Sequence, residues 1–153
     1  MINVFQKAPE FSLPDQEGKI HKLSDYLGKM VLIYFYPKDD TPGCTKEACS
    51  FRDNLPHFEK TGLIILGIST DSVVSHGKFA DKYKLPFTLL SDYNHEVVKA
   101  YEVWGPKKFL GKEFLGTKRT SFLIDKKGQI IKIYENVKPA AHAQEVLSDI
   151  AAF

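Results

Sequence analysis

An uninterrupted apolar and aromatic run, Met30–Tyr36, constrains the fold of this chain more than any other segment. A strand that is apolar on both faces belongs in the centre of a sheet, with other elements covering both sides. Pro37 ends the run, and apolar residues then recur at helical spacing from Thr41 to Lys60. A second buried strand is expected at Leu63–Ser69. The order strand, helix, strand predicts a parallel pair inside an α/β sheet.

The remaining segments extend this sheet and add antiparallel strands. We expect a hairpin from Phe11–Leu13 and Ile20–Leu23, a helical turn at Ser24–Tyr26, a helix from Asp71 or Ser72 to Tyr83, a strand at Pro86–Leu90, a short helix over Asn94–Tyr101, a hairpin of Arg119–Asp125 with Gln129–Glu135, and a last helix over Pro139–Ile150. Pro56 predicts a kink or break in the long helix. Together these elements predict a thioredoxin-like three-layer α/β fold with a mixed β-sheet flanked by helices, in a single domain spanning 1–153.

Composition and charge exclude several classes of function. The chain has 153 residues, 26% of them charged, and a net charge of +2 without a basic block, which gives no footprint for nucleic acid or an anionic membrane. No apolar run approaches the roughly 20 residues of a membrane helix. Met1–Lys7 lacks the order of a secretory signal, so a cytoplasmic protein is expected. Without a glycine-rich phosphate loop or paired histidines, no cofactor or metal is expected.

The two cysteines suggest redox chemistry, because Cys44 and Cys49 are too close in sequence for a disulfide to restrict the unfolded chain much. Thr41 suits an N-cap and Pro42 the first helical position, which places Cys44 in the first turn. The amide groups and dipole at that end favour negative charge, so a thiolate is stabilised there and can act as a nucleophile. They can also stabilise charge on a reacting oxygen. A buried cysteine that only packs at a helix start remains the alternative.

Cys49 is ambiguous from the residues alone. Five positions along an ideal helix separate two Cα atoms by roughly 8–9 Å, whereas a disulfide needs roughly 4.4–6.8 Å. The two thiols therefore cannot bond while the helix is intact. Taken alone, a cysteine in the position of Cys49 is more often a small core residue than a second redox thiol. A Cys–His hydrolase is a further alternative, with His57 as the near candidate for a base. The other histidines, at positions 21, 76, 95 and 142, are scattered and expected to be solvated or ordinarily packed.

Several motifs carry a family resemblance that covers nearly the whole chain. They are Pro37-x-x-x-Thr41-x-x-Cys44, the string from Thr41 to Asp53, the opening Ala8-Pro9-x-Phe11, and the segment Arg119–Asp125. In these motifs the chain resembles the peroxiredoxins, and within them the bacterioferritin comigratory protein branch, also called peroxiredoxin Q.

The resemblance implies a thiol peroxidase and assigns roles to individual residues. Cys44 matches the peroxidatic cysteine, which hydrogen peroxide or an organic hydroperoxide oxidises to a sulfenic acid. Thr41 matches the hydroxyl that bonds thiolate and peroxide, and Pro37 the residue that shields the pocket. Arg119 matches the guanidinium that stabilises the thiolate and orients the substrate, and Glu47 a supporting acid.

The resemblance also implies a catalytic cycle. Cys49 matches the resolving cysteine, which would form an intramolecular disulfide with Cys44 after the helix unwinds, and a thioredoxin-like reductant would restore both thiols. No third cysteine is available to a partner subunit, so a monomer is expected. Two other classes stay open: a general thiol–disulfide oxidoreductase, which the Cys-x-x-x-x-Cys spacing disfavours, and a non-catalytic binding or holdase protein with structural cysteines.

Overall fold

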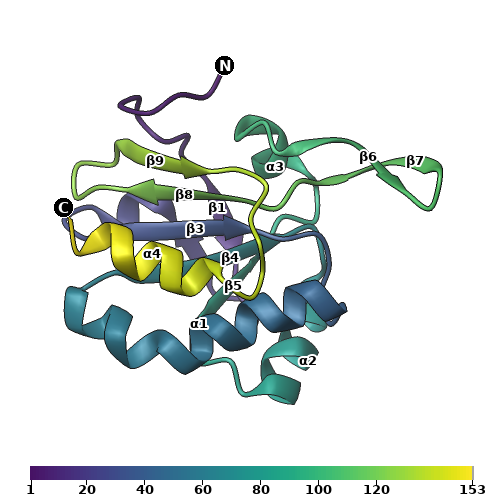
Figure 1. Ribbon diagram of the computed structural model, residues 1–153, viewed down its shortest axis with the longest axis horizontal. Helices are drawn as coiled ribbons and strands as arrows, with labels where there is room; N and C mark the ends of the chain where they lie inside the picture. The colour runs from purple at the N-terminus through teal and green to yellow at the C-terminus, as the bar shows by residue number, and fades with distance from the viewer. Residues whose placement is uncertain (153) are drawn as a thin grey trace.

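A computed structural model describes residues 1–152 as a mixed five-stranded sheet with helices packed on it (Figure 1). The strands are β1 (Ser12–Pro14), β2 (Ile20–Lys22), β3 (Val31–Phe35), β4 (Ile64–Ser69), β5 (Thr88–Ser91), β6 (Trp104–Phe109), β7 (Lys112–Thr117), β8 (Thr120–Ile124) and β9 (Ile130–Tyr134). The helices are α1 (Pro42–Thr61), α2 (Val73–Tyr83), α3 (Glu96–Ala100) and α4 (His142–Ile150), with a short 3-10 helix at Leu23–Tyr26.

Strand β3 lies at the centre of the sheet, whose order is β5-β4-β3-β8-β9. It pairs in parallel with β4 and antiparallel with β8, and all five of its residues are buried. The prediction of a doubly covered central strand is therefore confirmed. The parallel and antiparallel pairs also confirm the mixed sheet. Tyr34 of β3 stands between Gly67 of β4 and Ser121 of β8, a register that matters for the site described below.

Two apolar layers pack on opposite faces of this sheet, because alternate residues of β3 point to opposite sides. Leu32 and Tyr34 face the side covered by α1, α2 and α4. Val31, Ile33 and Phe35 face the other side, which is covered by α3 and the amino-terminal segment. The predicted three-layer arrangement of the thioredoxin type is confirmed.

A kink or a break was predicted at Pro56. The long helix α1 runs through this residue without a break, and Figure 1 shows that the helix is bent. Proline removes one helical hydrogen bond but does not end a helix that is otherwise held by packing. Ser72 is the residue that caps α2, where its side chain accepts a hydrogen bond from Ser75 N at 3.1 Å.

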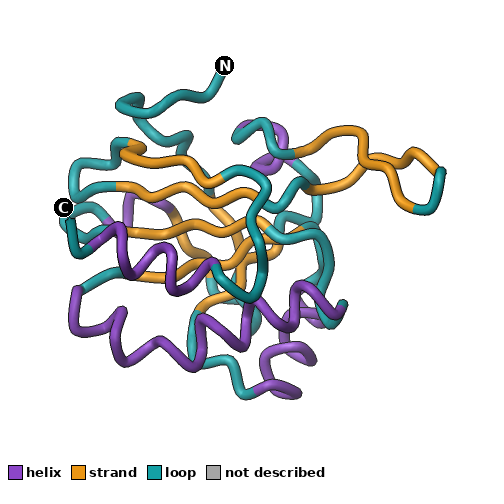
Figure 2. The backbone as a smooth tube through the Cα atoms, viewed as in Figure 1, coloured by secondary structure: helices purple, strands orange, loops and turns teal. Residues whose placement is uncertain are grey.

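The β6–β7 hairpin is the element that sequence analysis missed. It projects from the body as an arm (Figure 2), and the side chains of Phe109, Leu110 and Leu115 on it are mostly exposed. Strands are recognised by alternation between a buried and a solvated face. This arm has no buried face along most of its length, so that signal is missing.

Candidate active site

The site begins where the chain leaves β3 and enters α1. Thr41 occupies the N-cap position of α1 and Pro42 its first helical position, as expected. The Thr41 side chain, however, does not cap the helix, because its Oγ1 donates a hydrogen bond to the carbonyl oxygen of Lys38 at 2.8 Å. The first helical bond joins Thr45 N to Thr41 O at 2.8 Å, so the N–H groups of Gly43 and Cys44 have no partner within the helix, and Pro42 has no N–H.

Cys44 is the third residue of α1, and its side chain is buried, with 1% of the residue exposed. Arg119, just before β8, donates a hydrogen bond from Nη2 to Cys44 Sγ at 3.3 Å. Gly43 makes room for this contact: a Cβ atom there would lie 3.1 Å from Arg119 Nη2. A permanently charged guanidinium therefore faces the sulfur, which lies at the positive end of the helix dipole.

Glu47, one turn further along α1, is the second partner of Arg119. Arg119 Nη1 lies 2.7 Å from Glu47 Oε1, and the Glu47 side chain has no exposed surface. Burial raises the pKa of Glu47 to about 7, although Arg119 acts in the opposite direction. Burial alone would lower the pKa of Arg119, but Glu47 and Cys44 raise it above its ordinary value. One guanidinium thus bridges two positions on the same face of α1.

Tyr34 lies beneath these groups on β3 and was not predicted as part of the site. Its ring packs against Phe51 of α1 with the centroids 4.7 Å apart. Gly67 of β4 leaves the necessary space, since a Cβ there would come 2.8 Å from Tyr34 Cζ. Burial raises the pKa of Tyr34 well above its ordinary value, with Glu47 adding to the effect, so the hydroxyl stays protonated. Within residues 1–152, Tyr34 Oη and Glu47 Oε2 are buried without a hydrogen-bond partner.

The other predicted residues are placed less directly. Pro37 is partly buried and lies two residues after the end of β3, on the loop that leads to α1. Cys49 is partly buried, and both cysteines are free thiols. His57 is exposed, and no histidine in the described part of the chain is hydrogen-bonded to Cys44. The geometry therefore brings Arg119 and Glu47 to Cys44, and it gives no support to a Cys–His hydrolase.

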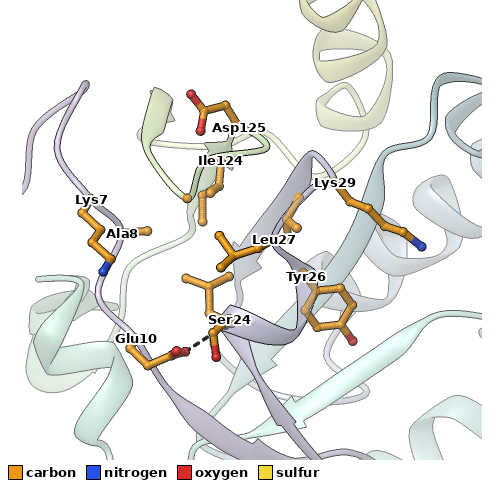
Figure 3. Close-up of a pocket in the computed structure, with 12 residues that line it drawn as sticks. Lys7, Ala8, Glu10, Ser24, Tyr26, Leu27, Lys29, Ile124 and Asp125 are labelled. Atoms are coloured by element: carbon orange, nitrogen blue, oxygen red, sulfur yellow. Dashed lines mark hydrogen bonds between the residues drawn. The ribbon is translucent and has the colours of Figure 1, made fainter.

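Neither of two hollows in the described part of the chain is lined by Cys44. A groove of about 730 Å³ shares Arg119 with the site, but Phe122 in its wall belongs to the apolar layer on the other face of the sheet. A smaller pocket lies on the opposite face of the sheet, where Ala8, Ile124 and neighbouring residues surround it (Figure 3). Because Cys44 packs on the α1 face, that second pocket is not part of the same site.

Comparisons with known proteins agree with this geometry. Residues 4–133 match the model of the AhpC/TSA family. The chain is 48% identical to Peroxiredoxin Bcp of Bacillus subtilis over 149 residues, which is 97% of this chain and 95% of the relative. It is 49% identical to Peroxiredoxin Bcp of Escherichia coli over 141 residues, covering 92% and 90%. The chain belongs to the AhpC/TSA family, in its Bcp/PrxQ branch of peroxiredoxins.

Solved structures of proteins from the same branch superpose closely on this chain. A mutant of Xylella fastidiosa PrxQ superposes with a TM-score of 0.94 at 34% identity, covering 99% of this chain and 97% of that one. The bacterioferritin comigratory protein of Xanthomonas campestris superposes with a TM-score of 0.87 at 40% identity, covering 93% and 90%. The fold and the family together make this peroxiredoxin a thiol peroxidase. Among the described residues, no helix is both long and apolar enough to span a bilayer.

Proposed function

We propose that Cys44 is the peroxidatic residue of this peroxiredoxin. Its thiolate attacks one oxygen of hydrogen peroxide or an alkyl hydroperoxide, and the O–O bond breaks. The sulfur keeps the attacked oxygen as a sulfenic acid, and the other oxygen leaves and takes up a proton to become water or an alcohol. The observation that carries this proposal is the 3.3 Å contact between Arg119 Nη2 and Cys44 Sγ, in the first turn of a helix.

The surrounding residues support the same step. Arg119 is a fixed fork of donors that can hold the thiolate and, as the O–O bond breaks, the departing oxygen. Glu47 holds the fork in place through its 2.7 Å contact with Nη1. Thr41 and Pro37 lie on the segment between β3 and α1, and we assign Thr41 to the hydrogen bonding of peroxide and Pro37 to the exclusion of water.

Cys49 then acts as the resolving residue. Its sulfur attacks the Cys44 sulfenic acid, a disulfide forms, and the hydroxyl group leaves as water with the proton of the Cys49 thiol. Because five helical positions keep the two Cα atoms too far apart, the first turns of α1 must unwind before this step. A thioredoxin-like dithiol reduces the disulfide by exchange and is itself oxidised.

One domain is sufficient for this cycle, so we propose a monomer that needs no cofactor. Two unpaired thiols suit a reducing compartment, and we place the reaction in the cytoplasm.

Peroxide consumption coupled to a thioredoxin, its reductase and NADPH tests the proposal. Cys44→Ser should abolish turnover, and Cys49→Ser should allow one oxidation per chain but block recycling. Ser50→Ala, a change of one partly buried hydroxyl next to Cys49, is a control that should keep full turnover. Full activity of Cys44→Ser would contradict the mechanism. An absence of the intramolecular disulfide in mass spectra after mild peroxide treatment would contradict the resolving role.

A general thiol–disulfide oxidoreductase makes a different prediction in the same assay. Such an enzyme would reduce a disulfide substrate such as insulin at a useful rate without peroxide. This peroxiredoxin should not, because its two sulfurs are separated by the intact helix.

A further inference from the structure

A buried histidine outside the Cys44 site organises the loop that leads into it. His76 of α2 is fully buried, and its Nδ1 lies 2.7 Å from Asp39 Oδ2. Its Nε2 lies 2.9 Å from the carbonyl oxygen of Leu90 in β5. Asp39, in the loop between β3 and α1, also accepts hydrogen bonds from Tyr36 Oη at 2.6 Å and Ser75 Oγ at 2.8 Å. All of these groups belong to elements that pack against the loop.

The hydrogen-bond partners fix the number of protons in this pair. A carbonyl oxygen only accepts, so His76 Nε2 carries a proton. The 2.7 Å contact between Nδ1 and Asp39 then needs a second proton, held either by the imidazole or by the carboxyl group. In both cases the pair is neutral as a unit and every polar atom is satisfied. Asp39, Asp71 and His76 have ligand atoms within 4.8 Å of one another, but these atoms are already engaged in hydrogen bonds.

The same loop has two further attachments. Asp39 N donates a hydrogen bond to Asp71 Oδ2 at 2.9 Å. Asp40, which adopts a positive φ of 58°, binds Lys82 Nζ at 2.8 Å and Tyr83 Oη at 2.7 Å. Those last two contacts are exposed and contribute little each, whereas the contacts of Asp39 are buried. The Asp39–His76 pair is therefore the strongest attachment between the loop and α2.

We propose that His76 and Asp39 are positioning residues that anchor the start of α1. The pair holds the backbone two residues before Thr41 and five before Cys44, so it fixes the direction in which the first turn leaves the loop. It also sets the upstream limit of unwinding, because the chain can open from Thr41 onward while Asp39 stays bound. This inference rests on the proposed cycle, in which α1 is folded for attack on peroxide and open for disulfide formation.

The two half-reactions should respond to the anchor in opposite directions. A loosened loop places the first turn of α1 less well for the peroxide reaction, and a misplacement of about 1 Å can cost up to 10²-fold in rate. The same loosening favours the open state, so the disulfide forms faster from the sulfenic acid. A substitution that only destabilises the fold has no reason to slow one step and accelerate the other.

The chain provides a matched control in a second His–Asp–Tyr cluster. His21 of β2 lies 2.7 Å from Asp15 Oδ2 through Nε2, and 2.7 Å from Tyr26 Oη through Nδ1. This cluster is also largely buried, but it belongs to the β1–β2 hairpin and the 3-10 helix. His21→Leu therefore removes the same chemistry without touching the loop before α1.

The experiment measures each half-reaction separately. In a Cys49→Ser background, the rate of Cys44 oxidation is measured by competition for hydrogen peroxide with a second peroxidase. In the chain with both cysteines, the rate of disulfide formation is measured by rapid quenching, alkylation and mass spectrometry.

His76→Leu and Asp39→Ala should slow oxidation about tenfold and accelerate disulfide formation about threefold. In Asp39→Asn, both the oxidation rate and the rate of disulfide formation should stay within about twofold of the parent. The amide nitrogen of the new side chain can donate to a neutral Nδ1 of His76, and its carbonyl oxygen still accepts from the Tyr36 hydroxyl.

The proposal is overturned if His76→Leu and Asp39→Ala change both rates in the same direction, or if His21→Leu produces the same opposed changes. Amide hydrogen exchange of the reduced protein gives an independent readout that does not use peroxide. Exchange over residues 38–45 should accelerate in His76→Leu and stay at the parent rate in His21→Leu, and equal exchange in the two would also overturn it. If Cys44 of the parent did not react with peroxide at all, the proposed cycle would fail, while the exchange result would still decide the anchor.

Discussion

The two ends of helix α1 are held to the protein in different ways. At the amino end, Cys44 and Glu47 face a single guanidinium, that of Arg119, across contacts of 3.3 and 2.7 Å. Further along, Phe51 and Phe58 are fully buried, and their rings pack at a tilted angle with the centroids 5.9 Å apart. Polar contacts can be exchanged for water when a segment opens, but aromatic burial is lost outright. The unwinding that we propose would therefore start at the amino end of α1 while the rest of the helix stays packed.

This difference shows how one helix can serve two steps of a reaction. In the proposed cycle, the first turn would supply the helix dipole and Arg119 the positive charge that activate the Cys44 thiol. This turn also has fewer large buried apolar side chains than the part of α1 that contains Phe51 and Phe58. Motions that accompany function are expected in segments of low local stability. The following substitutions test whether the two ends are as distinct as their contacts indicate.

Phe51→Ala should have the largest effect, and it should act on stability. Phe51 is 0% exposed and packs against Tyr34, Phe87 and His142. Deleting a buried aromatic ring costs about 3–5 kcal/mol, which urea unfolding measures directly. Leu55→Ala, at a partly buried position of the same helix, is the matched control and should cost less. A cost below about 1 kcal/mol for Phe51→Ala would contradict the view that aromatic packing holds this end.

Arg119→Lys should have the next largest effect, and it should act on the peroxide reaction. An ammonium group cannot hold Cys44 and Glu47 together as the two prongs of a guanidinium do. We expect the rate of Cys44 oxidation to fall about 10²-fold, with about 2.7 kcal/mol of transition-state stabilisation lost. The exposed neighbour provides the control, since Lys118→Ala should leave the rate unchanged. If the rate of Cys44 oxidation fell less than threefold in Arg119→Lys, the two-pronged guanidinium would be dispensable for the reaction.

Glu47→Gln should change how stability depends on pH. The folded-state pKa of Glu47 is about 7, above the ordinary value of 4.5, so folding takes up a proton between these values. This group's contribution to stability is therefore present at low pH and is lost as the pH rises through 7. Relative to the parent, the Gln variant should gain on the order of 2 kcal/mol between pH 5 and 8.

Urea unfolding of the parent and Glu47→Gln across that range provides the measurement. Replacing Glu47 also removes the partner of Arg119, which adds a cost that varies little with pH. The slope of the difference, and not its absolute value, is thus the quantity to compare. Parallel stability curves for the two proteins would show that Glu47 does not titrate near neutral pH.

Gly43→Ala should have the smallest effect, with stability and activity changing in opposite senses. Alanine favours the helix by at most about 1 kcal/mol over glycine. Its Cβ would lie 3.1 Å from Arg119 Nη2, so the guanidinium must shift and the Cys44 oxidation rate should fall a few-fold. Gly77→Ala in α2 is the matched control, because the nearest atom to a Cβ at Gly77 would be the carbonyl oxygen of Gln16, at an ordinary contact distance of 3.5 Å. Equal rates in both variants would show that the contact over Gly43 is unimportant.

The elements with strong periodicity could be predicted from the sequence, and those held by long-range contacts could not. The run around β3 and the spacing of α1 have local patterns that burial confirms. The arm of β6 and β7 gives no such pattern because most of its side chains meet solvent on both faces.

The residues of the candidate site divide in the same way, into those that local sequence predicts and those that long-range contacts bring to the site. Cys44 could be chosen from its place at a helix start, whereas Arg119 came only from the family resemblance, being 75 positions away in the sequence. Tyr34 and His76 were missed, because a tyrosine in a buried strand and a single histidine in a helix have no local signal of their role. Thr41 satisfied the composition rule for an N-cap, yet its hydroxyl bonds the carbonyl of Lys38, a competing local partner.

The two contacts of Arg119 depend on the helix in a way that links chemistry to shape. The guanidinium can touch Cys44 and Glu47 together only while these residues are one turn apart on the same face of α1. Once the first turn opens, the two partners separate and a rigid fork cannot follow both. In the proposed cycle, Arg119 would therefore respond to whether the helix is folded: an opened chain would lose the contact that activates Cys44 Sγ, and would regain it only when the first turn has closed again.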